Sequence, residues 1–146
     1  MTVLRMDNVL IVVDDLEAGV AFFAAIGLEL EGEATVEGLS VDRLVALDGA
    51  RSDIVMMRTP DGHGRIELDK FHTPPAVRAE PENAPVNALG IRRIMFTVDD
   101  IEDVLGRLRS HGAELLGEVM DYEDQYRLCY IRGPEGIMVA LAEQLS

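Results

Sequence analysis

The sequence has only three histidines, the side chains that most often act as metal ligands or bases, and they are far apart. His63 lies in the turn sequence 61–64, His72 follows a predicted strand, and His111 stands beside Gly112. A cation is favoured near a helix C-terminus, so His111 fits a capping role. We interpret all three as solvated or locally capping side chains, with His72 near enough to the predicted site to be considered as a ligand. They do not form a convincing zinc ligand set.

Nucleophilic catalysis has equally little support. The single cysteine, Cys129, lies in the apolar run 128–131, where we predict that it packs as a small hydrophobic residue. No Ser/His/Asp or Cys/His arrangement and no glycine-rich phosphate loop stands out. One cysteine also excludes a disulfide framework.

Strand alternation places one carboxylate, that of Glu67, where it could act as a catalytic or ligand-binding group. Successive side chains of a strand point to opposite faces. In a predicted strand, Ile66 and Leu68 should cover a helix, so Arg65, Glu67 and Asp69 should face the other, concave side. Glu67 is therefore the candidate catalytic residue, as a general base, and a candidate ligand-binding residue.

The elements that would position Glu67 come from an internal duplication. Residues 8–17 align with residues 93–102 at an offset of 93 − 8 = 85, and Gly27 aligns with Gly112 at the same offset. Each copy opens with an apolar strand. An Asp-x-x-Glu pattern then predicts a helix start, and the aligned glycine predicts the helix end.

Three more strands follow each helix, so that each copy is predicted to be β-α-β-β-β. These strands begin after Gly27 and Gly112 and continue with the apolar runs 54–57 and 66–68 in the first copy, and 126–131 and 137–141 in the second. Proline-acid-glycine turns at 60–62 and 134–136 match at an offset of 74. The first copy therefore has an insertion of 85 − 74 = 11 residues, and we predict a short helix over 41–49.

These patterns predict an α+β protein in which residues 1–146 form a single domain. Module 1 (4–71) and module 2 (91–143) are joined by a proline-rich linker (72–90), which holds four of the six prolines. Such a linker allows the modules to fold back on each other or to be exchanged with a partner chain.

Composition excludes two classes of partner. The formal net charge of −14 and the lack of a basic run argue against nucleic acid. No apolar run approaches the roughly 18 residues of a membrane span. The N-terminal sequence does not resemble a signal peptide, so we expect a cytoplasmic protein without a membrane partner.

The paired β-α-β-β-β modules, the Asp-Asp-Leu-Glu or Asp-Asp-Ile-Glu helix starts and the Pro-acid-Gly turns resemble the glyoxalase, bleomycin-resistance and extradiol-dioxygenase superfamily, also called the vicinal oxygen chelate fold. The resemblance covers roughly residues 4–143. It implies that the two mixed sheets curl into a cup with the helices on the outer face. It also implies a homodimer and, in the enzymes, a divalent metal held by the first and last strands of each module.

The metal-ligand positions implied by the resemblance are occupied here by Asn8, Glu67, Arg93 and Ala140. Only Glu67 is an ordinary ligand, because Ala140 has no donor and Arg93 is a permanent cation. We expect no cofactor, although a divalent metal stays an open alternative. The Arg93 guanidinium would stand where the metal charge stands and pair with Glu67. Together with Met95, these four residues are our predicted ligand-binding site.

Aromatic and sulfur-containing side chains are concentrated on or beside the predicted cup strands. Tyr122, Tyr126 and Tyr130 surround the third strand of module 2, and alternation does not say which side they face. They pack in the core or line a cup for a flat apolar or cationic ligand.

Three functions follow from this reading of the sequence. The first is binding or sequestration of a small molecule without catalysis. The second is an enzyme of lyase, isomerase or dioxygenase type that uses a metal with an atypical ligand set, such as Glu67 with His72 and groups from a partner chain. The third is a metal-free enzyme of the same reaction types, with Glu67 as base and Arg93 as an oxyanion stabiliser.

Overall fold

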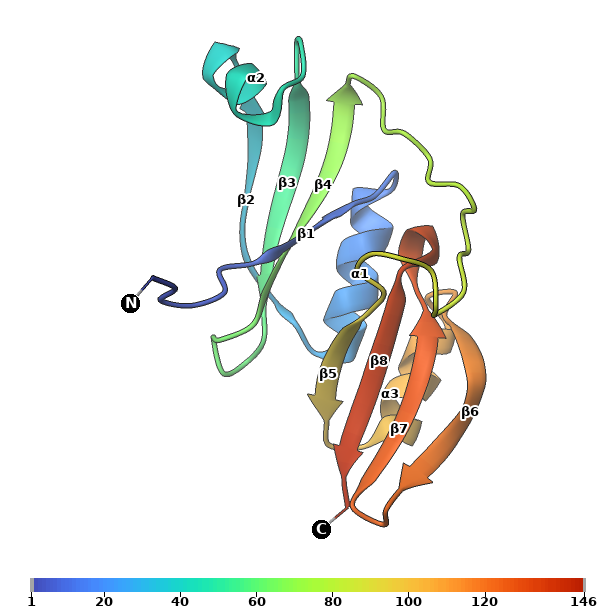
Figure 1. Ribbon diagram of the computed structural model, residues 1–146. Coiled ribbons are helices and arrows are strands. Elements are labelled where there is room, and N and C mark those ends of the chain that lie inside the picture. The colour runs from blue at the N-terminus through green and yellow to red at the C-terminus, as the bar shows by residue number, and fades with distance from the viewer. Residues whose placement is uncertain (1, 146) are drawn as a thin grey trace. The chain divides into compact units, whose positions relative to one another are not determined.

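The computed structural model describes residues 2–145 and has two units of similar architecture, one ending at Val77 and one beginning at Arg78. We call them unit 1 and unit 2. Each has a four-stranded mixed sheet with a helix packed on one face (Figure 1). The predicted α+β class and the two similar modules are confirmed. No described helix is long and apolar enough to cross a membrane.

Unit 1 contains the predicted strand and helix order with one inserted helix. Its elements are β1 (Val9–Val12), α1 (Leu16–Ile26), β2 (Glu29–Glu37), α2 (Leu39–Val45), β3 (Arg51–Arg58) and β4 (Arg65–Thr73). The sheet order is β1-β4-β3-β2, with β1 parallel to β4 and the other pairs antiparallel. The inserted helix α2 begins two residues earlier than predicted. It ends at Val45 because Ala46 adopts a left-handed conformation with φ 60°.

Unit 2 repeats this topology. Its elements are β5 (Ile94–Val98), α3 (Ile101–Arg109), β6 (Glu114–Tyr122), β7 (Tyr126–Arg132), the 3-10 turn η1 (Pro134–Gly136) and β8 (Met138–Gln144). The sheet order is β5-β8-β7-β6. The duplication extends to single hydrogen bonds after the helices: Leu28 N donates to Phe23 O at 3.1 Å and Ala113 N donates to Leu108 O at 3.2 Å. Donors and acceptors are each 85 residues apart, as in the sequence alignment.

Both long helices start one residue later than the Asp-x-x-Glu pattern suggests. The N-caps are Asp15 and Asp100, whose carboxylates accept hydrogen bonds from Ala18 N at 3.0 Å and Asp103 N at 3.1 Å. The second aspartate of each Asp-Asp pair is thus the cap, because its side chain reaches the free N–H group three residues ahead.

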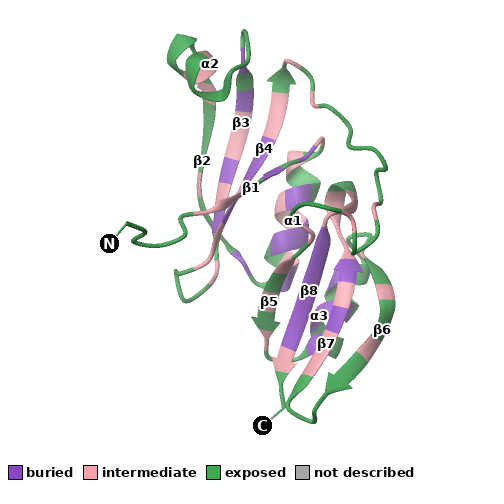
Figure 2. Ribbon diagram, in the orientation of Figure 1, coloured by how far each residue is buried: buried purple, intermediate pink, exposed green. Residues whose placement is uncertain are grey.

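The core of each unit lies between its helix and one face of its sheet (Figure 2). In unit 2 the four predicted helix positions, Ile101, Val104, Leu105 and Leu108, are all buried. In α1 the buried face is Gly19, Phe22, Phe23 and Ile26, so Leu16 and Val20 of the predicted face are only partly buried. We call the sheet face opposite the helix the open face of each unit.

The second half of the predicted linker packs on unit 2. The Arg132 guanidinium donates to the carbonyl oxygens of Asn83 at 3.4 Å and Ala84 at 2.7 Å. Gly136 lies so close that a Cβ added there would be 2.9 Å from Glu82 O. At the other end, β4 continues through Thr73, two residues beyond the predicted end of module 1.

Candidate functional site

The parallel pairs of strands place the predicted site residues at equivalent positions of the two sheets. Leu10 of β1 lies opposite Glu67 of β4, and Met95 of β5 lies opposite Ala140 of β8. Ile66 and Leu68, which flank Glu67, are buried on the helix side, so the Glu67 side chain lies on the open face. This is the orientation that alternation predicts.

Asn8 and Arg93 each stand one residue before the first strand of their unit. The Asn8 amide donates a hydrogen bond to Asp7 Oδ2 at 2.8 Å. The Arg93 guanidinium donates to the Tyr130 hydroxyl and lies over the Tyr130 ring, with 5.4 Å between its Cζ atom and the ring centroid. Tyr130 thus orients the cation from within unit 2. The pairing of Arg93 with Glu67 stays a prediction.

The strand register settles the direction of the tyrosines. Tyr130 lies opposite Ala140 and Tyr126 opposite Gln144, so both side chains belong to the open face of unit 2. Cys129 lies opposite Leu141 on the helix side, where it is buried and its pKa is raised by burial. The interpretation of Cys129 as a packed residue is therefore supported, and a reactive thiolate is disfavoured.

Asp69 joins Glu67 on the open face of unit 1. The residue is 6% exposed, and its Oδ1 atom has no hydrogen-bond partner among the described residues. Burial first, and then the hydrogen bond and negative charge of Glu67, raise the pKa of Asp69 to about 8. Alternation placed Asp69 on this face, but sequence reasoning did not include it in the site. An Asp two residues after a Glu on one strand was the available signal.

The cation nearest to Glu67 along β4 is held by another carboxylate. Arg65 Nε lies 3.1 Å from Glu31 Oε2, and Arg58 Nη1 lies 3.9 Å from the same oxygen. These partly exposed pairs form one end of the open face. Among the described residues of unit 1, no basic side chain forms an ion pair with Glu67 or Asp69.

His72 cannot complete a metal site with Glu67 within unit 1. Its Nε2 atom lies 2.8 Å from Asp53 Oδ2, and Asp53 lies opposite Lys70, on the same side of the sheet as Leu68. The hydrogen bond with His72, followed by that from Thr35, lowers the pKa of Asp53. Glu67 and His72 therefore lie on opposite faces, and the suggested pair of ligands is not formed.

The metal that the enzymes of the fold carry does not fit the donors present. Among residues 2–145, no group of three or more His, Cys, Asp or Glu side chains is arranged to hold an ion. Glu67 and Asp69 are only two donors, and Ala140 adds none. His63 and His111 are exposed and lie outside the open faces.

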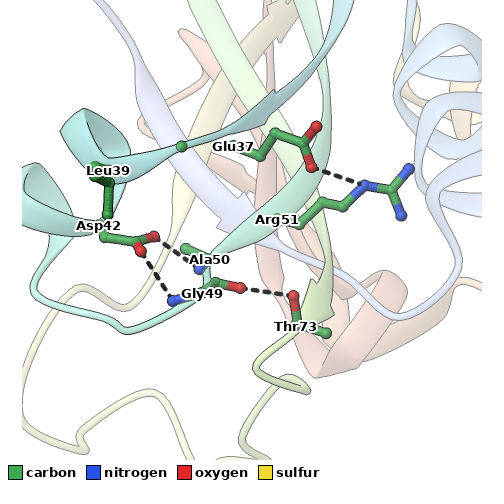
Figure 3. Close-up of a pocket in the computed structure, with 8 residues that line it drawn as sticks. Glu37, Leu39, Asp42, Gly49, Ala50, Arg51 and Thr73 are labelled. Atoms are coloured by element: carbon green, nitrogen blue, oxygen red, sulfur yellow. Dashed lines mark hydrogen bonds and ion pairs between the residues drawn. The ribbon is translucent and has the colours of Figure 1, made fainter.

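A separate pocket of about 420 Å³ lies where α2 joins the sheet of unit 1 (Figure 3). Its polar groups bond to one another. Asp42 accepts from Gly49 N at 2.9 Å and Ala50 N at 2.8 Å, and Thr73 Oγ1 donates to Gly49 O at 2.7 Å. None of the predicted site residues lines this pocket, and we interpret it as the junction of the insertion with the sheet.

Known proteins share both the sequence and the architecture. A glyoxalase family protein from Bacillus cereus is 56% identical, with a TM-score of 0.94 over 100% of this chain and 97% of that chain. The uncharacterized protein YaeR of Escherichia coli strain K12 is 28% identical over 141 residues, 96% of each chain. TnmS3, an antibiotic binding protein from Streptomyces sp. CB03234, shares the fold at 18% identity, with a TM-score of 0.60 over 99% of this chain and 98% of that chain. Residues 5–141 match the Glyoxalase/Bleomycin resistance protein/Dioxygenase superfamily, and this chain belongs to that family.

Proposed function

We propose that this protein binds a small organic molecule on the open faces of its sheets, without a metal at the family's usual ligand positions. The observation that carries the proposal is the equivalence of Glu67 and Ala140 in the two sheets. One position keeps a carboxylate and the other has a methyl group. Arg93, at a third ligand position, is a cation oriented by Tyr130. Such a set favours binding of an organic ligand over binding of a divalent ion.

The remaining side chains of the open faces suit an apolar ligand. Leu10 is 49% exposed and Met95 is 40% exposed, and they occupy equivalent positions of β1 and β5. Tyr126 and Tyr130 add aromatic surface on β7. Apolar walls with a few charged groups are typical of small-molecule sites. The antibiotic-binding protein TnmS3 gives a precedent for binding on this fold.

The test is ligand screening combined with elemental analysis. Untagged protein expressed in metal-replete medium is analysed for Zn, Fe, Mn and Ni, and then screened against a library of aromatic small molecules by thermal shift and calorimetry. We expect hits whose affinity is unchanged by chelator. A stoichiometric metal whose removal abolishes all binding would overturn the metal-free proposal.

Variants locate the binding surface. Leu10→Asp and Met95→Asp introduce a charge on each open face, and we expect each to weaken binding of the hits at least about tenfold, that is about 1.4 kcal/mol. Leu44→Asp is the matched control, because Leu44 lies on α2 and is also exposed. Equal losses in all three variants would argue against the open faces as the site.

A metal-free enzyme is the second candidate, and the carboxyl pair of Glu67 and Asp69 favours it. A carboxylate whose neighbour holds a proton at neutral pH is suited to proton transfer. Glu67→Gln should then abolish turnover of a bound compound while its affinity persists. Loss of both together would leave binding as the function.

We also propose a homodimer in solution, by analogy with the family. Static light scattering at several protein concentrations tests this directly. A mass equal to one chain at all concentrations would contradict it.

A further inference from the structure

We propose that α2 is the surface through which two copies of this chain associate, each α2 packing antiparallel on α2 of the other copy. The inference does not depend on the binding of a small molecule. It assigns an interface to the homodimer proposed above, for which the family gives only the number of chains. The partner is a second copy of this chain, and the contact is apolar at its centre and charged at its ends.

The segment 39–47 is rich in aliphatic side chains but buries none of them. Its helix, α2, has no buried residue, and Figure 2 shows it mostly exposed. The exposed fractions are 81% for Leu39, 83% for Leu44, 46% for Val45 and 37% for Leu47. Single exposed hydrophobic residues are ordinary, but several on one short segment mark a surface that binds a partner.

A helix as short as α2 needs packing to stay formed. It has seven residues, whereas isolated helices shorter than about 12–15 residues are marginal in water and depend on a packed apolar face. Within unit 1 the segment is held by the Asp42 carboxylate, which accepts hydrogen bonds from Gly49 N and Ala50 N (Figure 3). These bonds fix the loop but cover no apolar side chain. A second copy supplies the packing that α2 lacks.

Unit 2 has no counterpart of this surface. In unit 1, residues 38–50 join β2 to β3 and contain α2, whereas in unit 2 only residues 123–125 join β6 to β7. Unit 2 nevertheless forms the same order of strands in its sheet. The module therefore does not need α2 in order to fold, and the exposed aliphatic side chains of α2 have a use outside the folding of unit 1.

The charges on this segment favour a second copy over another partner. The chain has a net charge of −14, so most surfaces of two copies repel each other. Around α2, however, the Asp42 carboxylate is bonded to two backbone N–H groups, and the other charged side chains are Arg43 and Asp48, whose charges cancel. Both are exposed, and in the described part of the chain neither forms an ion pair. An acidic or a basic partner would match only one of these two charges.

A twofold axis beside the C-terminal end of α2 makes the surface complementary to itself. In such a contact, a residue that touches a second residue of the other copy is touched in return by the same pair in reverse. Arg43 of each copy then faces Asp48 of the other. Leu44 of each copy faces Leu47 of the other, between the two ion pairs. The exposed aliphatic side chains supply on the order of half of the roughly 800 Å² that a stable interface buries on each partner, so we expect a weak, concentration-dependent dimer.

Sedimentation equilibrium of the full chain over a wide range of concentrations measures the association. Leu44→Asp places two charges in the apolar centre of the contact and should weaken self-association at least about tenfold. Leu30→Asp is the matched control, because Leu30 is 57% exposed near the other end of β2. It should change the dissociation constant less than about twofold. Thermal unfolding of dilute protein shows that both variants are folded.

Exchange of the two charges tests the pairing between copies. Arg43→Glu places acids opposite each other and Asp48→Lys places bases opposite each other, so each should weaken self-association at least about fivefold. The double variant R43E/D48K keeps the net charge of the wild type and should return to within about twofold of its affinity. A mixture of the two single variants should form a heterodimer more tightly than either forms a homodimer, because each copy supplies the charge that the other needs.

The outcomes separate this inference from the proposals above. A dimer whose affinity does not change in Leu44→Asp would overturn α2 as the interface while the homodimer stands. A mixture of the single charge variants that associates no better than each alone would overturn the antiparallel pairing. A chain that stays monomeric at all concentrations overturns both the interface and the homodimer. The binding of small molecules is measured separately by the ligand screen, so its failure cannot be mistaken for failure of this contact.

Discussion

Glu67 and Ala140 occupy one position in two copies of the same sheet. Each lies on the strand that pairs in parallel with the first strand of its unit, opposite residues that are 85 positions apart in the chain, Leu10 and Met95. The next residue of the same face is Asp69 in unit 1 and Ala142 in unit 2. The two copies therefore share one framework, but unit 1 has two carboxyl groups at these positions and unit 2 has two methyl groups. This asymmetry is the basis for the predictions on pH.

Asp69→Asn should change how stability depends on pH. A carboxyl whose pKa is raised to about 8 by folding binds its proton more tightly in the folded state than in the unfolded state, where its pKa is near 3.8. The stabilisation linked to this proton is present below pH 4 and is lost as pH rises towards 8. Wild type should therefore lose on the order of a few kcal/mol between pH 5 and pH 8 relative to the variant. Urea denaturation at several pH values measures this difference.

The matched control for that prediction is Asp53→Asn. Asp53 has a lowered pKa, because it accepts hydrogen bonds from His72 and Thr35, so its contribution has the opposite sign. It stabilises the fold above pH 4 and is lost as pH falls through the lowered value. If the Asp69→Asn variant and wild type keep a constant stability difference from pH 5 to pH 8, Asp69 does not hold the proton.

The architecture could be predicted from sequence because it is repeated. The offset of 85 residues fixed the equivalence of strands and helices, and apolar periodicity fixed which side of β4 and β8 meets a helix. The predicted N-cap of α1 was wrong by one residue. The pattern Asp14-x-x-Glu17 makes Asp14 the cap, but the sequence is equally compatible with Asp15 as the cap and Ala18 as the donor. Only the direction of the Asp15 side chain distinguishes them.

The site was less predictable, because its chemistry depends on depth and on pairing across strands. Glu67 and Asp69 look alike in sequence, yet one is partly exposed and the other buried. The contact with Tyr130 joins Arg93, which directly precedes β5, to β7, and β5 and β7 are separated by β8 in the sheet. The local sequence does not predict that contact, because it depends on the register of three strands.

Removing the helix cap of unit 2 tests the corrected helix start. Asp100→Ala should lower the free energy of unfolding by about 1 kcal/mol, because Asp103 N loses its hydrogen-bond acceptor. Asp99→Ala is the control and should cost less than about half as much. Chemical denaturation of both variants gives the comparison. A larger loss in Asp99→Ala would restore the first aspartate as the cap.

The contact between Arg93 and Tyr130 should be measurable without a ligand. A double-mutant cycle with Arg93→Ala and Tyr130→Phe reports the hydrogen bond to the hydroxyl, and Tyr130→Leu adds the ring contact. We expect a coupling free energy of about 0.5–1 kcal/mol in the Leu cycle and less in the Phe cycle. Additive effects in both cycles would mean that Arg93 is not held by Tyr130 in solution.

The close approach of the linker to the turn of unit 2 predicts that Gly136 cannot be replaced. Gly136 has φ 73°, and a Cβ there would collide with the Asn83 side chain and lie 2.9 Å from Glu82 O. Gly136→Ala should therefore destabilise the protein by roughly 1–3 kcal/mol, since backbone strain and a backbone clash act together.

The matched control is Gly106→Ala in α3, where a Cβ meets nothing within 4 Å. That change should raise the free energy of unfolding by up to about 1 kcal/mol, because alanine has the higher helix propensity. Thermal or urea unfolding of the two variants compares the same added methyl group in the two places. If Gly136→Ala proves as stable as wild type, residues 82–84 do not pack on this turn, and Arg132→Ala should then also leave stability unchanged.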